Sequence, residues 1–470
     1  MRSRQCGVSR KNWIVGLTAF FCICCNQQMD GVACVNSGDC AGGICSNGIC
    51  IGDGNINTES EPTDSDTREL KSLTAVDVLF IVDNSGSMKQ EQSVLSSSIF
   101  ALMNGLYDEM IQRGGIAIDA VDVRVGVTSS DMGVSYNGQP YLENFDPHPV
   151  CTKGDGFGNN GRMFTFYPSS DSVAISVPVE PQTIPCHESG SECPADWLCM
   201  WLDNNGEGRC TPIHEQTTTE CPDVASFVAE DGFLSLGNSA AEQYGYQQFV
   251  SAVACMSSVG LEGCAFEQQL AAIPAAFHYG AQERFLRADA MTLIIVVSDE
   301  DDCSLGSNQW HEVHELGTNE SNIACGTYPE YMTDVTEIYE QIQAAKTTAV
   351  GEDARDTIMF AAIVGVPLGP FCEGFGDDIV DCMNVSLANG TMGAPSVVQR
   401  PDPNDNLAFY FEYACERYED GETVTQAYPA TRIVQLAQQF GEYGYVYSVC
   451  NGDWTHAMQA LVAKMAVRLF

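Results

Sequence analysis

Basic residues are scarce in this chain. Lysine and arginine together number 21 among 470 residues, whereas aspartate and glutamate number 63, so the formal net charge is −42. A surface of this sign repels phosphate groups, which argues against nucleic acid as a partner. It suits divalent cations and basic partners instead.

Long apolar runs are missing beyond the N-terminus. Residues 13–25 form an apolar run after a basic start, and this run is too short for a comfortable membrane-spanning helix. The pattern predicts a signal peptide over residues 1–25. Because it ends in cysteines, we expect Cys24 or Cys25, with Cys25 preferred, to carry a lipid anchor; secretion without lipid is the alternative.

Cysteine, by contrast, is abundant. The chain has 22 cysteines, a density typical of proteins in an oxidising compartment. After residue 25 the C-x2-C spacing of zinc ribbons is absent, and 18 cysteines remain, an even number that permits complete pairing. The sequence therefore predicts an exported protein with many disulfides.

Two short segments hold four cysteines each. Residues 26–54 form a predicted Cys-rich knot, and a similar set recurs inside the chain; the two sets are Cys34, Cys40, Cys45, Cys50 and Cys186, Cys193, Cys199, Cys210. Such Gly-rich segments have almost no core, so we expect two disulfides in each, with the connectivity open. Each set is either a binding module or a stapled spacer. Residues 55–72 predict an acidic linker.

Residues 73–470 predict one large α/β domain. Apolar, β-branched runs that indicate buried parallel strands alternate with helical stretches. We expect strands at 76–82, 121–128, 291–297, 357–364 and 445–448, and helices at 90–112, 239–256, 264–283, 330–346, 431–440 and from 454. This order predicts a doubly wound, mostly parallel Rossmann-like sheet with helices on both faces, plus small disulfide-rich modules. The stretch 137–238 predicts a Cys-rich insertion, which we expect near the carboxyl edge of the sheet.

One short motif follows the first strand directly. Asp83, Ser85 and Ser87 stand at alternate positions between that strand and a helix. This is the carboxyl edge of the sheet, where α/β proteins bind ligands. Side-chain oxygens suit a hard divalent cation, so the motif predicts a site for Mg²⁺, with Ca²⁺ or Mn²⁺ as alternatives. Simple capping of the helix by Asp and Ser is the competing interpretation.

The motif and its surroundings resemble a known family. Asp-x-Ser-Gly-Ser after Val-Leu-Phe-Ile-Val is similar to the metal-ion-dependent adhesion site of von Willebrand factor type A domains and integrin inserted domains. The likeness covers roughly residues 72–136 and 239–470. It implies that Asp83, Ser85, Ser87 and Asp299 hold the cation, with Asp299 acting through water.

The resemblance also implies a role. It points to a non-enzymatic domain of an exported bacterial protein, placed at the cell surface, in the periplasm or on the outer membrane. A protein partner presenting Asp or Glu would complete the coordination of the cation, and the only membrane contact would be the N-terminal lipid.

At one position the chain departs from the family pattern. Ala265 stands where a threonine ligand is expected, and Glu267 or Thr128 is the candidate that supplies an oxygen instead. A glutamate beside the ion would neutralise it further. We then expect tighter metal binding and weaker binding of an acidic partner.

The remaining cysteines fall into five expected pairs. These are Cys255 with Cys264, Cys303 with Cys325, Cys372 with Cys382, Cys415 with Cys450 and Cys151 with Cys221. Each pair would close a loop beside the sheet.

Enzyme signatures are absent from the sequence. It has no Gly-x-Ser-x-Gly, His-Glu-x-x-His or Gly-x-x-x-x-Gly-Lys-Ser/Thr motif. Asp83 with Asp299 superficially resembles the metal-bound aspartate of a phosphatase, but Lys89 is the only nearby cation for phosphate, so a hydrolase is a minor alternative. The main alternative to a binding domain is a surface scaffold whose metal site has decayed.

Overall fold

The structure is a computed structural model. It describes residues 44–46, 49–51, 75–116, 121–132, 135–136, 139–140, 159, 161–164, 174–178, 185–186, 197–201, 208–217, 227, 233–236, 245–261, 263–264, 266–282, 284–306, 323–351, 357–400, 408–419 and 421–469.

The chain divides into two compact units, Met1–Leu70 and Lys71–Phe470. In the first unit the described residues form an antiparallel pair, β1 (Ile44–Ser46) and β2 (Ile49–Ile51). The predicted signal peptide, the lipidation candidates Cys24 and Cys25, and the first two cysteines of the knot lie outside the described residues.

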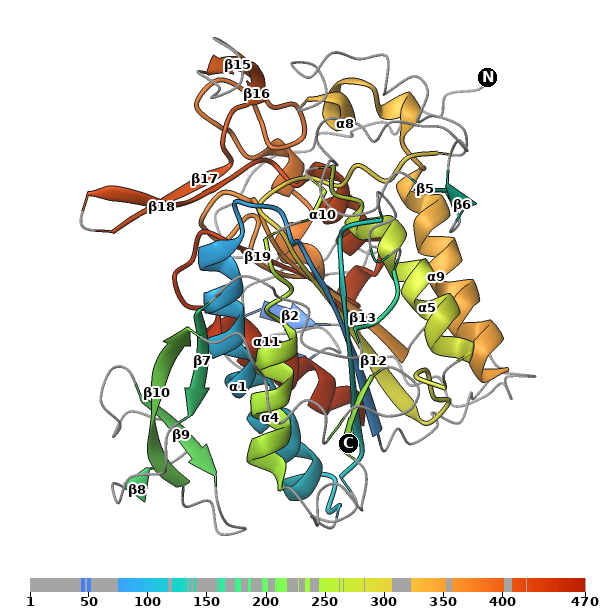
Figure 1. Cartoon of the computed structure of the whole chain (residues 1–470), viewed down its shortest axis with the longest axis vertical. Coiled ribbons are helices and arrows are strands. Elements are labelled where there is room, and N and C mark those ends of the chain that lie inside the picture. Colours follow the sequence, from blue (N-terminus) through green and yellow to red (C-terminus); the bar gives the residue numbers. More distant parts are fainter. Residues whose placement is uncertain are drawn as a thin grey trace, which may run out of the picture. The chain divides into compact units, whose positions relative to one another are not determined.

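The second unit is a mixed α/β structure around a seven-stranded, mostly parallel sheet (Figure 1). The strand order is β11 (Leu234–Leu236), β4 (Val123–Ser129), β3 (Ala75–Val82), β12 (Ala290–Val297), β13 (Ile358–Val364), β19 (Gly444–Ser448) and β14 (Gly374–Phe375). The five inner strands are parallel, and the two edge strands are antiparallel to their neighbours. The five inner strands are those predicted from apolar runs, whereas the short edge strands were not predicted.

Helices cover both faces of this sheet (Figure 1). One face packs against α1 (Lys89–Gln112), α4 (Tyr246–Met256) and α11 (Thr455–Leu469), and the other against α5 (Gln269–Gln282), α9 (Val335–Val350) and α10 (Thr431–Gln439). The alternation of side chains along a strand produces the two cores. Val78 and Phe80 of β3 enter the first core, and Leu79 and Ile81 enter the second.

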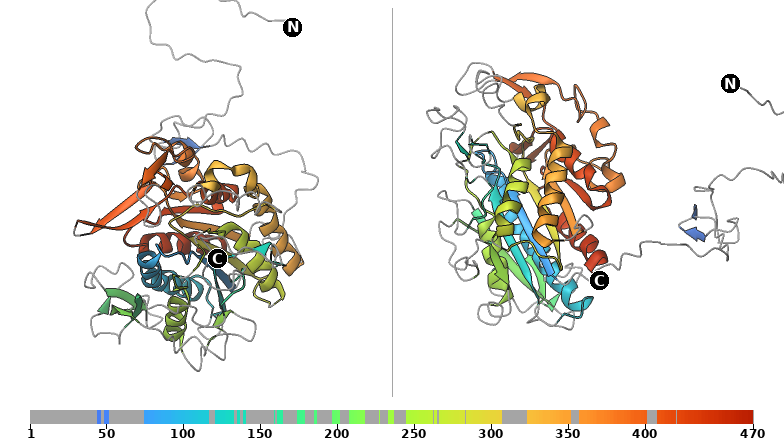
Figure 2. Two further views of the ribbon diagram at one scale, coloured as in Figure 1. Left: turned by 45° about the horizontal axis from the view of Figure 1, so that its top comes forward. Right: turned by 90° about the vertical axis from the view of Figure 1, so that its right-hand side faces the viewer.

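Smaller elements complete the unit. They are β5 (Ser135–Tyr136), β6 (Gln139–Pro140), α8 (Ala324–Thr327), β15 (Val397–Arg400), β16 (Ala408–Phe411), β17 (Cys415–Glu419), β18 (Glu422–Ala427) and 3-10 turns at Pro329–Tyr331, Gly376–Ile379, Cys382–Asn384 and Gly441–Tyr443. The β17–β18 hairpin projects from the body (Figure 2, left view).

The predicted insertion forms a small sheet of β7 (Ala174–Pro178), β8 (Pro185–Cys186), β9 (Trp197–Trp201) and β10 (Gly208–Thr217). Strand β7 packs against α1 and α4, beside the helix layer. The expectation that the insertion lies at the carboxyl edge is therefore wrong for this sheet. It holds for residues 159–164, because Asn159 Oδ1 accepts a hydrogen bond from Ser129 Oγ at the end of β4.

The two four-Cys sets share a backbone feature. In each set the third and fourth cysteines are register partners on antiparallel strands, Cys45 with Cys50 and Cys199 with Cys210. This agreement supports the internal repeat predicted from the sequence. Cys186 is on β8, and Cys34, Cys40, Cys193, Cys151 and Cys221 lie outside the described residues.

Three predicted disulfides are present, Cys303–Cys325, Cys372–Cys382 and Cys415–Cys450. Cys255 and Cys264 are also disulfide-bonded. Disulfides of this number fit an exported protein in an oxidising compartment. Within the described ranges, no helix has both the length and the apolar character to cross a membrane.

Candidate functional site

The predicted motif lies where β3 ends and α1 begins. The main chain leaves β3 at Asp83, whose N–H still donates to the Val297 carbonyl of β12 (2.9 Å). Two strands that end side by side thus place Asp83 next to the residues that follow β12. Because Asp299 comes two residues after Val297, both carboxylates stand at one edge of the sheet.

Asp83 is fully buried and held by two hydrogen bonds. Its Oδ1 accepts from the Ser85 N–H (2.7 Å), and its Oδ2 accepts from Ser298 Oγ (2.7 Å). Gln92 donates from Nε2 to the Asp83 carbonyl (3.0 Å) and to the Gly260 carbonyl (2.8 Å). These contacts fix the turn after β3, and Ser298 and Gln92 were not predicted as parts of the site.

The two motif serines face each other. Ser85 Oγ and Ser87 Oγ are 3.0 Å apart, with Ser85 buried and Ser87 exposed. The site is therefore open to solvent on the Ser87 side. The capping interpretation fails in its simple form, because Met88 occupies the N-cap position of α1 and no side chain caps it.

Glu267 and Asp299 carry buried carboxylate oxygens to which no N–H group in the described part of the chain donates. Both residues are buried, and the oxygens are Oε1 and Oε2 of Glu267 and Oδ1 of Asp299. The contacts of these carboxyl groups are Glu300, which can share a proton with Glu267, and the Ser87 hydroxyl beside Asp299. The Glu267 backbone is fixed by its carbonyl, which accepts from the Cys303 N–H (2.8 Å). Buried polar atoms are normally satisfied, so three such oxygens at one edge require a physical explanation.

The electrostatics of these carboxylates are strongly perturbed. Burial, followed by the negative charges of Glu300 and Asp83, holds the pKa of Glu267 well above its usual range. Burial and then the charges of Asp83, Glu300 and Glu91 do the same to the pKa of Asp299. Burial, with the charge of Asp83, raises the pKa of Glu300 to about 7. The five carboxylates therefore interact closely, and Arg417 is the positive charge that acts on one of them, Glu91.

Thr128 behaves differently from the other predicted ligands. It is buried, donates from Oγ1 to the Arg162 carbonyl (3.0 Å) and accepts from Asn159 Nδ2 (2.7 Å). Its hydroxyl hydrogen and one lone pair are thus committed to the segment 159–164. The prediction that Thr128 supplies an oxygen to a cation is not supported, which leaves Glu267 as the candidate. Ala265 lies outside the described residues.

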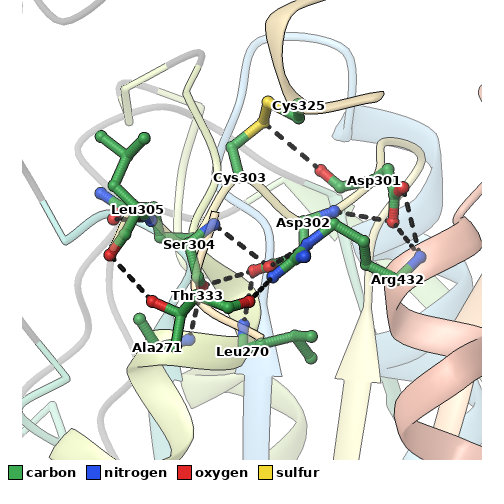
Figure 3. Close-up of polar contacts among 11 residues, drawn as sticks. Leu270, Ala271, Asp301, Asp302, Cys303, Ser304, Leu305, Cys325, Thr333 and Arg432 are labelled. Atoms are coloured by element: carbon green, nitrogen blue, oxygen red, sulfur yellow. Dashed lines mark hydrogen bonds and ion pairs between the residues drawn. A yellow bond between two sulfur atoms is a disulfide. The ribbon is translucent and has the colours of Figure 1, made fainter. Parts of the chain in front are cut away.

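The acidic run after β12 contains Asp301 and Asp302, and these two residues have a structural role (Figure 3). Asp301 accepts from the Arg432 N–H at the start of α10 (2.9 Å). Asp302 is buried and accepts from the Leu270 N–H of α5 (2.9 Å) and from Arg432 Nε (3.1 Å). These two aspartates therefore accept hydrogen bonds from the starts of α10 and α5, and Asp302 also binds the Arg432 side chain.

Sequence reasoning also missed Glu91 and Glu300. Glu91 lies in the first turn of α1, four residues after Ser87, and only 2% of it is exposed. A carboxylate in the first turn of the helix that directly follows the motif was a signal available in the sequence. Among the described residues, no group of three or more His, Cys, Asp or Glu side chains has the geometry to hold a metal ion.

Comparison with known proteins adds little to this geometry. No family model matches the chain, and no curated protein matches it. One solved structure that aligns with it is the pilus adhesin RrgA from Streptococcus pneumoniae, with 12% identity and a TM-score of 0.20 over 84% of this chain and 44% of that one. The chain thus spans less than half of the length of that adhesin, and a TM-score of this size does not establish a common fold.

Proposed function

We propose that this chain is an exported bacterial protein-binding domain of the von Willebrand factor type A kind, built around a divalent cation. The observation that carries the proposal is the set of buried oxygens without a described N–H donor on Glu267 and Asp299 beside Asp83, Ser85 and Ser87. A hard cation takes such oxygens as ligands. It would also stabilise the charged forms of Glu267 and Asp299, whose pKa values are raised by burial first and by the neighbouring carboxylates second.

The residues present fit Mg²⁺, with Ca²⁺ or Mn²⁺ as alternatives. Two hydroxyls, Ser85 and Ser87, would join Asp83 and Glu267 around the ion, and Asp299 would bind through water. The direct ligands would thus be two hydroxyls and two carboxylates.

The strand order supports a doubly wound architecture for the central sheet. From β3 the sheet extends through β4 to β11, and on the other side through β12, β13 and β19. The direction of extension therefore reverses between β3 and β12. Ligands bind at such reversal points in open α/β sheets, outside the carboxyl ends of the strands. The candidate site lies at this point.

The proposed role is binding and not catalysis. A partner side chain with an oxygen, in the family a carboxylate of Asp or Glu, would complete the coordination of the ion. Glu267 makes this chain a special case, because a second carboxylate near the ion weakens the attraction for an acidic partner. We propose that the N-terminal Cys25 attaches the chain to a membrane through lipid.

Calorimetry with Mg²⁺, Ca²⁺ and Mn²⁺ on the mature, disulfide-bonded chain tests the proposal. We expect saturable binding that is lost in Asp83→Ala and weakened in Ser87→Ala, whose exposed position leaves the fold intact. Glu340→Gln, an exposed change on α9, is the charge-matched control and should bind as the wild type does. Wild-type protein that binds none of the three ions would overturn the proposal in favour of a surface scaffold.

A further inference from the structure

A cavity of about 280 Å³ opens beside the candidate metal centre. One wall is formed by Ser87, just before α1, by Glu91 in its first turn, and by Asp299 and Glu300 after β12. The other wall is residues 423–426 of β18. Ligand pockets for whole small molecules usually start at about 300 Å³, so this cavity has the size of one long side chain.

Two tyrosines close the cavity, and the backbone holds its walls together. Tyr413 and Tyr428 flank the β17–β18 hairpin and line the space. The Tyr428 N–H donates to the Asp299 carbonyl (2.8 Å), which joins the two walls. The Cys415–Cys450 disulfide ties the base of the hairpin to the end of β19. The cavity is thus a built feature of the fold.

The lining is acidic and contains no basic residue, although the charge of Arg417 reaches Glu91 from outside the lining. Three carboxylates, Glu91, Asp299 and Glu300, line the cavity, and none of its lining residues is Lys, Arg or His. Glu91 Oε2 and Asp299 Oδ1 are buried and have no hydrogen-bond partner among the described residues, while their side chains are 2% and 4% exposed. Thr425 hydrogen-bonds to the Glu91 carboxylate and Ser87 to the Asp299 carboxylate, so one acceptor oxygen of each is left for a further donor.

Two arginines lie behind the lining residues, and each already has partners there. Arg417 binds Glu419 through Nη1 (2.6 Å) and Thr425 through Nη2 (3.3 Å). Arg400 stacks on the Tyr413 ring, with its guanidinium carbon 3.5 Å from the ring centroid. Neither arginine is among the residues that line the cavity.

One divalent ion would leave the cavity acidic. The proposed ligands of the ion are Asp83 and Glu267, with Asp299 through water, whereas Glu91 and Glu300 are not among them. A second acidic group beside them would be repelled, and a cationic group would be attracted. Ammonium and guanidinium groups also donate several charge-assisted hydrogen bonds and lie favourably against tyrosine rings.

We propose that this cavity takes a lysine or arginine side chain of the partner, next to the partner group that reaches the cation. The partner would then carry a basic residue close to its oxygen ligand. The idea of a partner rests on the proposed function, but the preference of the cavity for a cation rests on Glu91 and Glu300 and does not require the metal.

Binding of n-butylammonium, n-butylguanidinium, butyrate and n-butanol to the mature chain tests the proposal, by ligand-observed NMR with Mg²⁺ and with EDTA. We expect saturable binding of the two cations and none of butyrate or butanol. Glu91→Gln should weaken the binding of the two cations at least about tenfold, which is the loss of affinity expected for one charge-assisted hydrogen bond. Glu340→Gln is the control and should change nothing.

A second variant covers the case in which Glu91→Gln does not fold. Thr423 is exposed and lines the cavity, so Thr423→Lys should fill it and abolish binding of the cations. Butyrate binding better than n-butylammonium, or cation binding unchanged in Thr423→Lys, would overturn the proposal. Mg²⁺ binding without cation binding would reject the cavity proposal alone, and cation binding without any metal binding would reject the metal centre alone.

Discussion

Two ion pairs of equal length should contribute very differently to stability. Arg432 Nε lies 3.1 Å from Asp302 Oδ2, and Lys464 Nζ lies 3.1 Å from Glu442 Oε2. The side chains of the first pair are 11% and 0% exposed, and those of the second are 28% and 71% exposed. The two pairs are thus matched in distance and differ in burial and in the further hydrogen bonds that Asp302 accepts.

Asp302→Ala should lower the free energy of unfolding by about 3 to 5 kcal/mol, because it leaves the buried Arg432 guanidinium unpaired. The change also removes the acceptor of the Leu270 N–H at the start of α5 and the acceptor of Ser304 Oγ (2.6 Å). Glu442→Ala should cost less than about 1 kcal/mol, since water already solvates that pair.

Urea unfolding of the disulfide-bonded chain, followed by tryptophan fluorescence, measures both changes; Trp454 is a buried reporter. The double variant Asp302→Ala/Arg432→Met should be more stable than the sum of its two single changes predicts, because no charge is then left buried and unpaired. If Asp302→Ala and Glu442→Ala cost the same, within about 0.5 kcal/mol, burial does not govern these pairs and the reasoning is wrong.

Three further outcomes follow from the structure. Burial lowers the pKa of Lys346 to about 8, so between about pH 8 and 10.5 the folded state binds fewer protons than the unfolded state. The stability of the wild type relative to Lys346→Met should therefore rise over this pH range by at most about 3 kcal/mol, which urea unfolding at several pH values measures. Replacing both Cys415 and Cys450 by serine should lower the free energy of unfolding by up to about 4 kcal/mol in the loop-entropy model. The midpoint of urea unfolding should fall and proteolysis of the hairpin should become faster, and unchanged resistance to proteolysis would contradict this expectation. Gly365→Ala should give little folded protein, because its Cβ would lie 1.8 Å from the backbone oxygen of Tyr428; normal soluble yield would refute this.

The inner strands of the sheet could be predicted from the sequence because most of them are nearly continuous runs of apolar residues. β3 and β12 are buried on both faces, so every position is apolar or paired, and the runs stand out from their surroundings. The exception within β3, Asp77, is paired with Arg287 at 2.6 Å. The hairpin β17–β18 could not be found in this way, since its residues are mostly exposed and carry no period-2 apolar pattern.

The motif at Asp83 could be predicted because its residues are neighbours in the sequence. The rest of the site could not be predicted because its residues come together only through the fold. Glu267 and Asp299 reach Asp83 only through the pairing of β3 with β12 and the loop that leads into α5. Sequence spacing suggested Thr128 as readily as Glu267. The structure separates them by hydrogen bonding, since the Thr128 hydroxyl is committed to Asn159 and Arg162 and the Glu267 carboxylate has no N–H donor among the described residues.

The charge balance decides which partners the proposed site can select. With threonine near the ion, the partner carboxylate would be the group that neutralises it; with Glu267 in that place, part of this neutralisation already comes from the chain itself. Glu267→Thr should therefore weaken Mg²⁺ binding and strengthen the binding of a carboxylate probe to the loaded protein, with acetate as the probe in calorimetry. The opposite response, or none, would mean that Glu267 lies outside the coordination of the ion. A partner of the wild-type protein then has to gain its affinity elsewhere, and the neighbouring surface that offers it is the acidic cavity lined by Glu91 and Glu300.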